Sequence, residues 1–227
     1  MILHRRRRLL LAGAAGLGAT AGFWRADAGG LFPPAAAQPG AAPSAATDPR
    51  LTERSVGRPD APVTVFEYFS LTCSHCGAFH RETYPRVRKE LIDSGQMRLV
   101  FRDFPLDQLA LAAHCVARAL PPEHYDGFIS ALFAAQDRWA YARGVDHLAE
   151  IAKIAAIAGL TREQVNAAAN DEALRRGVLE IRLRGEQQYQ VQATPTFIFG
   201  PAGKVRQTGN VGFDRFAELL AQARQAS

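Results

Sequence analysis

The sequence contains few cysteines, and their small number limits the chemistry that they can support. Three are present among 227 residues: Cys73 and Cys76, which form a single Cys-x-x-Cys pair, and Cys115. A structural zinc site needs about four ligands, commonly from two such pairs, so a zinc site is disfavoured. A c-type haem is excluded because Gly77, and not a histidine, follows the second cysteine.

The sequence also lacks an apolar run long enough for a standard transmembrane helix. The closest candidate follows Arg5–Arg8 and consists of leucines and a Gly/Ala-rich stretch that ends at Phe23. This order of charged and apolar segments predicts an export signal over residues 1–28, with cleavage near Ala26–Ala28 or, as a second choice, Ala35–Ala37. The consecutive arginines resemble a twin-arginine signal. An uncleaved membrane anchor is the alternative.

Outside the N-terminal segment the chain has almost no excess of charge. The net charge is +5 and the pI about 9.4, but residues 1–47 account for +4, which leaves +1 for the rest. The charge therefore provides no reason to expect a nucleic-acid partner. Residues 29–50 are rich in proline and alanine and predict a linker. Because 48% of the residues are hydrophobic, residues 51–227 are expected to form one domain with a large core.

The Cys-x-x-Cys pair lies where a predicted strand meets a predicted helix. Residues 63–69 are β-branched and aromatic, which is typical of a strand, and residues 77–91 have helical spacing. Cys73 is then expected at a helix N-terminus, where unpaired N–H groups and the helix dipole stabilise a thiolate. Cys76, one turn later, can close a disulfide with it. A purely structural disulfide is the alternative, although so short a loop constrains little.

The remaining pattern predicts a long helical segment between two groups of strands. Residues 97–102 predict a second strand, parallel to the first, and residues 107–189 have helical spacing throughout. Pro85 is expected to kink the helix after the cysteines near Tyr84. The last elements are predicted strands at 196–199 and 204–207, joined as a hairpin, and a helix at 213–224.

Three motifs together resemble the DsbA-like branch of the thioredoxin superfamily. They are Phe66-Glu67-Tyr68-Phe69-Ser70-Leu71-Thr72-Cys73-Ser74-His75-Cys76, Phe101-Arg102-Asp103-Phe104-Pro105-Leu106 and Ala193-Thr194-Pro195-Thr196-Phe197. The resemblance covers the chain from Val56 onward. It implies an α/β thioredoxin-like fold with an inserted all-helical domain at about residues 106–189.

The resemblance also implies roles for individual residues. Cys73 matches the exposed nucleophile and Cys76 the resolving thiol, and His75 matches the residue that helps to stabilise the reduced thiolate. Ser74 departs from the proline found in DsbA itself. Glu67 lies on the buried strand, where an unpaired carboxylate is costly, and matches the acid that relays protons near the buried cysteine. Exposed positions for His75 and Glu67, with no function, are the alternatives.

The third motif implies a substrate-binding loop. Thr194-Pro195 matches the loop that carries the family's cis-proline, and the backbone of Thr194 would pair with an extended substrate chain. Cys115 lies on a largely apolar predicted helix, so a buried, inert thiol is favoured over a regulatory one.

The residues and the resemblance together predict an exported, periplasmic thiol–disulfide oxidoreductase that introduces disulfides into folding envelope proteins. The implied partners are reduced, unfolded substrate proteins and a membrane reoxidant similar to DsbB. A monomer is expected, and no metal or organic cofactor is implied. One alternative is a disulfide reductase or isomerase. The other is a non-enzymatic binding protein or chaperone that retains the disulfide only as structure.

Overall fold

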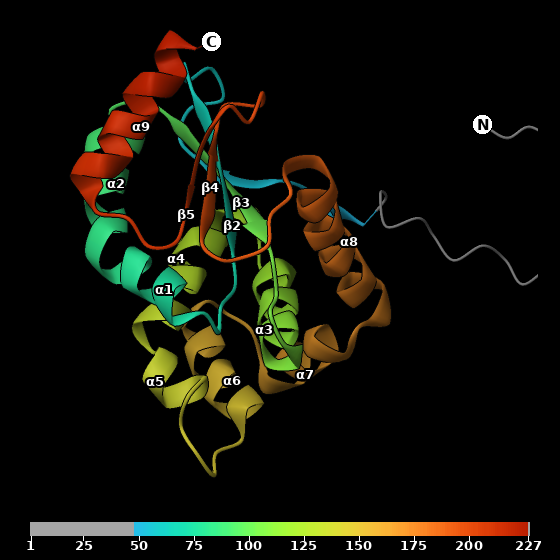
Figure 1. Ribbon diagram of the computed structural model, residues 1–227. Coiled ribbons are helices and arrows are strands. Elements are labelled where there is room, and N and C mark those ends of the chain that lie inside the picture. Colours follow the sequence, from blue (N-terminus) through green and yellow to red (C-terminus); the bar gives the residue numbers. More distant parts are fainter. Residues whose placement is uncertain (1–47, 227) are drawn as a thin grey trace, which may run out of the picture. The chain divides into compact units, whose positions relative to one another are not determined.

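The computed structural model of the protein describes residues 48–226 (Figure 1). The predicted export signal and the linker up to residue 47 lie outside the described residues. Pro49–Leu51, at the predicted end of the linker and the start of the domain, form a 3-10 turn (η2). Within the described part of the chain, no helix combines the length and the apolar character needed to span a bilayer.

A five-stranded mixed sheet forms the centre of the described domain, in the order β1-β3-β2-β4-β5. The strands are β1 (Arg54–Val56), β2 (Thr64–Phe69), β3 (Arg98–Asp103), β4 (Thr196–Phe199) and β5 (Val205–Thr208). The predicted parallel pair is confirmed, because β2 and β3 run in the same direction, and β4 and β5 form the predicted hairpin. β1 was not predicted from the sequence. It is an edge strand of three residues, too short to show an alternating pattern.

A long helical segment separates β3 from β4, as predicted. It comprises α3 (Gln108–Ala119), α4 (Pro122–Ala134), α5 (Gln136–Trp139), α6 (His147–Ile157), α7 (Arg162–Asn170) and α8 (Glu172–Tyr189). A final helix, α9 (Phe213–Gln225), follows β5. This order of elements places a helical insertion inside a β-α-β and β-β-α framework.

The helix that begins after Cys73 is continuous but contains two π-helical turns. Two α-helical stretches, α1 (Ser74–Ala78) and α2 (Tyr84–Val87), are each followed by a π-helical turn, η3 (Phe79–Thr83) and η4 (Arg88–Ile92). Proline has no N–H to donate. The chain passes Pro85 with a wider turn, in which the N–H of Tyr84 donates to the carbonyl of Phe79. A π turn therefore lies just before the position of the predicted kink, and the kink itself stays a prediction.

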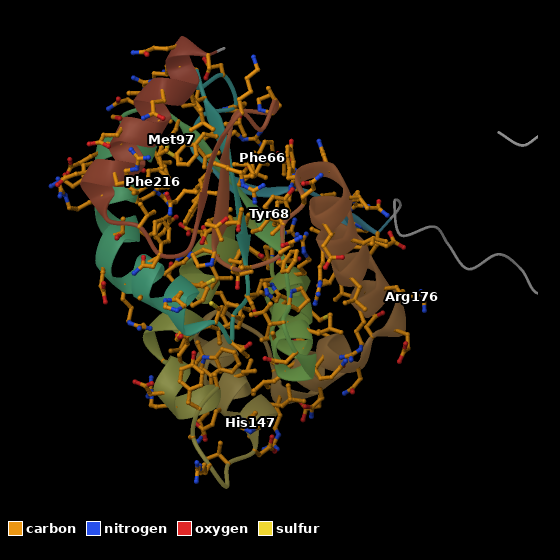
Figure 2. All side chains as sticks on the ribbon, viewed as in Figure 1. Phe66, Tyr68, Met97, His147, Arg176 and Phe216 are labelled. Atoms are coloured by element: carbon orange, nitrogen blue, oxygen red, sulfur yellow. The ribbon has the colours of Figure 1, made fainter. Side chains whose placement is uncertain are left out.

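The two faces of the sheet are covered by helices from different parts of the chain. Phe66 and Tyr68, labelled in Figure 2, pack in one cluster on one face of the sheet. Because side chains alternate along β2, Glu67 lies on the opposite face. On the Tyr68 face, α8 packs so closely that a Cβ on Gly185 would lie 2.4 Å from a carbon of the Tyr68 ring. The other face carries the main core, in which Phe216 of α9 packs edge-on against Phe197 of β4. The sheet is thus enclosed on both faces.

A buried ionic cluster lies where β3 meets the helical insertion. The Asp103 carboxylate at the end of β3 accepts hydrogen bonds from Arg118 Nε and, at 2.9 Å, from the Tyr125 hydroxyl, and lies 2.9 Å from His114 Nδ1. All four residues are buried. Burial favours the neutral acid, but the charge of Arg118 and the hydrogen bonds with Arg118 and His114 outweigh it and hold the pKa of Asp103 below its usual value.

The same cluster fastens the first described residues to the insertion. Arg118 Nη1 donates to the carbonyls of Arg50 (3.1 Å) and Thr52 (2.9 Å), and Arg54 Nη2 donates back to the carbonyl of Arg118 (3.3 Å). The guanidinium group of Arg118 on α3 therefore connects η2 and Thr52 to β3, while its carbonyl group binds Arg54 at the start of β1.

Replacement of Asp103 by asparagine is expected to destabilise the protein strongly. The variant leaves the buried guanidinium of Arg118 without its anion, and breaking a buried pair in this way costs roughly 3–5 kcal/mol of unfolding free energy. Urea unfolding at neutral pH measures the loss. Because the native pKa of Asp103 is depressed, its contribution is present above the unfolded value of about 4 and is lost as the pH falls below it. The difference in unfolding free energy between the variant and the wild type should therefore decrease at acid pH.

Asp60→Asn is the matched control, because Asp60 pairs with Arg58 at 2.6 Å but both side chains are exposed. Such exposed pairs contribute little to stability, because water and salt screen their charges. If the two variants lost similar amounts of unfolding free energy, the buried cluster around Asp103 would stabilise the protein no more than an exposed ion pair does.

Candidate functional site

The two cysteines of the Cys-x-x-Cys pair occupy different environments at the start of α1. Cys73 is the N-cap residue, with extended backbone angles and a partly exposed side chain, whereas Cys76 lies in the first turn and is completely buried. β2 ends at Phe69, and the Cys73 N–H donates to the carbonyl of Ser70, so a single tight turn leads from the sheet into the helix. One thiol is thus accessible and the other is shielded.

The environment lowers the pKa of Cys73 to about 5, from an ordinary value of 9.0. The largest cause is a hydrogen bond from the Cys76 thiol to the Cys73 thiolate. The Thr194 side chain and the backbone N–H groups of Cys76 and His75 lower the pKa further, while partial burial opposes them. These donors hold negative charge at the N-terminus of α1, where the helix dipole also favours it.

The pKa of Cys76 is raised well above its ordinary value. Burial is the main cause, and the negative charges of Cys73 and Glu67 add to it. The pair is therefore asymmetric, with an accessible thiolate held by a buried, protonated thiol.

The loop that precedes β4 lies directly against the nucleophile. The Thr194–Pro195 peptide bond is cis, and the carbonyl oxygen of Thr194 lies 3.3 Å from Cys73 Sγ, although the two residues are 121 positions apart. The hydroxyl of Thr194 is buried and has no hydrogen-bond partner among the described residues while Cys73 is a thiol. It is available to donate to the thiolate, which accounts for its effect on the pKa of Cys73.

Glu67 is buried beneath the pair, as predicted, and it has a partner that the sequence did not indicate. Its Oε1 atom lies 2.9 Å from Nε2 of His80, and both side chains are almost inaccessible to solvent. His80 follows Cys76 by one helical turn, which places it on the same buried side of the helix. That spacing was the signal that could have identified it.

Gln136 is a second site residue that the sequence did not reveal. This buried side chain of α5 donates from Nε2 to the carbonyls of Leu71 (2.8 Å) and Cys73 (3.0 Å). Gly77 leaves the space that it needs, since a Cβ at that position would lie 2.0 Å from Gln136 Oε1. The helical insertion thus fixes the backbone at Leu71 and at the nucleophile, Cys73.

An aromatic residue of the insertion lies beside the nucleophile. Tyr141 is 44% exposed, and its hydroxyl donates to the carbonyl of Thr72 at 2.9 Å. Burial raises the pKa of Tyr141, and the negative charge of Cys73 contributes to the same effect. An apolar surface therefore borders the reactive sulfur.

The structure places His75 at the site but does not test the role predicted for its imidazole. The side chain is exposed, and the contribution of His75 to the low pKa of Cys73 comes through its backbone N–H. Stabilisation of the thiolate by the imidazole stays a prediction.

Cys115 lies away from the pair and is buried, as predicted. It packs with Leu111, Leu174 and Val178, and burial raises the pKa of its thiol to about 12. A protonated, enclosed thiol is a poor nucleophile.

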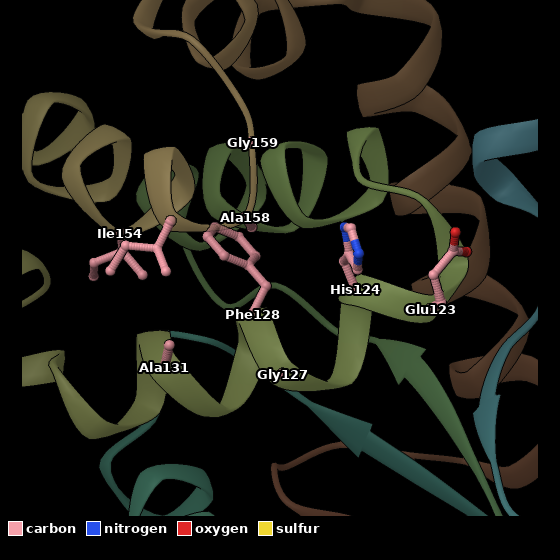
Figure 3. Close-up of a pocket in the computed structure, with 9 residues that line it drawn as sticks. Glu123, His124, Gly127, Phe128, Ala131, Ile154, Ala158 and Gly159 are labelled. Carbon is pink, nitrogen blue, oxygen red and sulfur yellow. The ribbon is translucent and has the colours of Figure 1, made fainter.

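The described residues form no metal centre, and one pocket of the structure lies apart from the cysteine pair. Among residues 48–226, no group of three His, Cys, Asp or Glu side chains could hold a metal ion. One pocket of about 510 Å³ lies between α4 and the end of α6, where Phe128 and Ile154 line it (Figure 3). Its lining residues belong to the insertion and include none of the site residues.

The fold and the asymmetric dithiol define the class of protein, and comparison with known proteins agrees. Residues 50–220 match the family model described as Thioredoxin, and the chain belongs to the thioredoxin family. The predicted thioredoxin-like fold with an inserted helical domain is confirmed.

Within that family, the chain is similar to DsbA proteins. The structure of alpha-DsbA1 from Wolbachia pipientis superposes with a TM-score of 0.70 at 28% identity, over 77% of this chain and 92% of that one. BdbD from Bacillus subtilis, at 18% identity and a TM-score of 0.63, over 76% of this chain and 93% of that one, shares the fold.

A curated relative from Rickettsia conorii, called "Putative protein-disulfide oxidoreductase", is 25% identical over 169 residues. The match covers 74% of this chain and 59% of the relative. The chain therefore spans somewhat more than half the length of the curated relatives that it matches first.

Thiolate absorbance as a function of pH is expected to show one transition near pH 5, from Cys73. Cys76→Ala should move this transition to higher pH, because it removes the hydrogen bond that lowers the pKa most. His75→Ala serves as the comparison, since it leaves the backbone N–H in place and should produce the smaller change. A wild-type transition near pH 9, or a larger effect from His75→Ala, would contradict this assignment of causes.

Proposed function

We propose that the protein is an exported thiol–disulfide oxidoreductase that transfers a Cys73–Cys76 disulfide to reduced, folding proteins. The observation that carries the proposal is the difference between the two thiols. Cys73 is stabilised as a thiolate, and a stabilised thiolate favours the reduced form of the pair over the disulfide. The disulfide form is then a good acceptor of electrons from substrate thiols.

The reaction proceeds by two exchanges. A substrate thiolate attacks Cys73 Sγ, the bond between Cys73 and Cys76 breaks, and Cys76 leaves as a thiolate that takes up a proton. A second substrate thiolate then attacks the substrate sulfur of the mixed disulfide, and Cys73 leaves as a thiolate. Two substrate thiols become one disulfide, and the protein retains the two electrons as its dithiol. The low pKa of Cys73 makes it a good leaving group in the second exchange.

The surroundings of Cys73 support an extended polypeptide as substrate. The backbone at Thr194 lies 3.3 Å from Cys73 Sγ at the edge of the site, where an added chain could pair with it, and Tyr141 presents an exposed ring nearby. Thr194 and Pro195 are thus assigned to substrate binding, with Cys73 and Cys76 as the redox-active pair.

The physiological setting is part of the same proposal. An export signal over residues 1–28 would deliver the protein to the periplasm, where disulfides persist. The substrates would be reduced envelope proteins, and a membrane protein similar to DsbB would restore the disulfide. We propose that the protein acts as a monomer.

Equilibration with glutathione buffers tests the proposal most directly. The expected result is a reduction potential more oxidising than that of glutathione, because stabilisation of the Cys73 thiolate favours the dithiol, together with rapid oxidation of a reduced two-cysteine peptide. Cys73→Ala should abolish the peptide oxidation, whereas Cys115→Ala should leave it intact because Cys115 is remote and buried.

Other outcomes would favour the alternatives. A strongly reducing potential, or a stable dimer in sedimentation that rescues scrambled disulfides, would indicate a reductase or isomerase. A disulfide that resists glutathione would indicate a structural bridge in a binding protein.

A further inference from the structure

We propose that His80 is a positioning residue that holds Glu67 and shares a proton with it, so that the pair exchanges a proton with Cys76 during disulfide exchange. The inference rests on the proposed function and extends it to a residue with no role so far. It concerns the buried thiol, whose charge must change in every cycle while it has no contact with solvent.

The contact between the two side chains is well defined and isolated from solvent. His80 Nε2 lies 2.9 Å from Glu67 Oε1, with side-chain exposures of 1% and 0%. The other polar atom of each side chain, Nδ1 of His80 and Oε2 of Glu67, is buried without a hydrogen-bond partner among the described residues. Unpaired buried polar atoms are costly, so these two positions require an explanation other than stability.

The walls around the pair are aromatic. The ring of Phe133, from α4, stacks on His80 with centroids 4.3 Å apart, and the ring of Phe79 lies edge-on at 5.5 Å. On the neighbouring strands, Phe101 and Phe197 stand opposite Glu67 in the sheet. Such surroundings disfavour an uncompensated charge, so in the disulfide form the pair holds one shared proton and has no net charge.

Other titratable groups near the pair are few. Tyr84 lies with its ring 4.8 Å from that of His80, but its hydroxyl donates to Asp126, which also binds Arg88. Beyond Phe69 lies His114, with its own carboxylate partner. Cys76 is a further titratable group near the pair, since the charge of Glu67 contributes to its high pKa. The pair can therefore respond to the charge on Cys76.

The proton balance of the two exchanges follows. When Cys76 leaves as a thiolate, the pair transfers its shared proton to that sulfur and becomes a carboxylate that accepts a hydrogen bond from neutral His80 Nε2–H. The pair stays in this deprotonated state while Cys76 is a thiol. In the reverse step, the pair accepts the proton of the Cys76 thiol, and the resulting thiolate attacks Cys73 in the mixed disulfide. No atom or electron is left over in either direction.

The protein contains a matched control for this pair. His114 also lies 2.9 Å from a buried carboxylate, that of Asp103, also has one ring nitrogen without a partner, and also packs against Phe69, with centroids 5.0 Å apart. Unlike Glu67, however, Asp103 has further partners in Arg118 and Tyr125 on its two oxygens. The two histidines are thus both buried, and they differ in how many further partners their carboxylates have.

Reaction of the reduced protein with a chromogenic aromatic disulfide, dithiobisnitrobenzoate, separates the two cysteines. Cys73 attacks first and releases one coloured thiolate, and Cys76 then attacks the mixed disulfide and releases the second. His80→Gln retains an amide donor for Glu67 but cannot exchange a proton. It is expected to slow the second phase by roughly 10- to 100-fold, near the lower end of what general acid–base catalysis contributes, and to leave the first phase unchanged.

His114→Gln should leave both phases unchanged. An unaltered second phase in His80→Gln, or an equal effect from His114→Gln, would overturn the proposal for His80 while the proposed function stands. Absence of the first phase in the wild-type protein would instead contradict the proposed function itself.

Nitrogen NMR of the histidine rings provides a test without any substitution. In the wild-type protein, the ring signals of His80 are expected to change between the disulfide and dithiol forms, because the proton that His80 shares with Glu67 in the disulfide form has passed to Cys76 in the dithiol form. The ring signals of His114 should stay constant. Identical His80 signals in the two forms would overturn the proposal even if His80→Gln failed to fold.

Discussion

The hydrogen bond from the Cys76 thiol to the Cys73 thiolate is the interaction on which the site depends. It requires one sulfur to be buried and protonated and the other to be partly exposed and charged, and the fold produces both conditions within one helical turn. The strand-to-helix junction places Cys73 at the N-cap, and the main core under α1 encloses Cys76. The thioredoxin framework thus gives two chemically identical side chains different thiol pKa values, and the remaining site residues modify that difference.

The order of strands and helices could be predicted because it follows from hydrophobic periodicity, which is a local property of the sequence. The β-branched run before Cys73 and the helical spacing from residue 107 to 189 identify the sheet and the insertion, since periodicity reports which face of an element is buried. The β1 strand was missed because it pairs through only three residues with β3, and nothing in so short a segment distinguishes an edge strand from a loop.

Site residues could be predicted from the sequence only where they form a short motif of neighbouring residues. The cysteine pair and the Thr194–Pro195 loop are visible in the sequence because each forms a short motif. Gln136 was not visible, because its importance lies in contacts with carbonyl groups that any residue could offer at positions 71 and 73. His80 was missed for a related reason: its partner, Glu67, comes from a strand 13 residues earlier, and only the folded chain brings the two together.

The contact between Gly77 and Gln136 has a consequence for the evolution and engineering of the domain. The residue after the second cysteine has no room for a side chain because an amide from the insertion occupies that space. The two positions are 59 residues apart and lie on either side of the boundary between framework and insertion. The residue at one position nevertheless constrains the residue at the other. A chimera that received its helical insertion from a relative with a different residue at position 136 would need a compensating change at position 77, and homologous chains should exchange these two residues together.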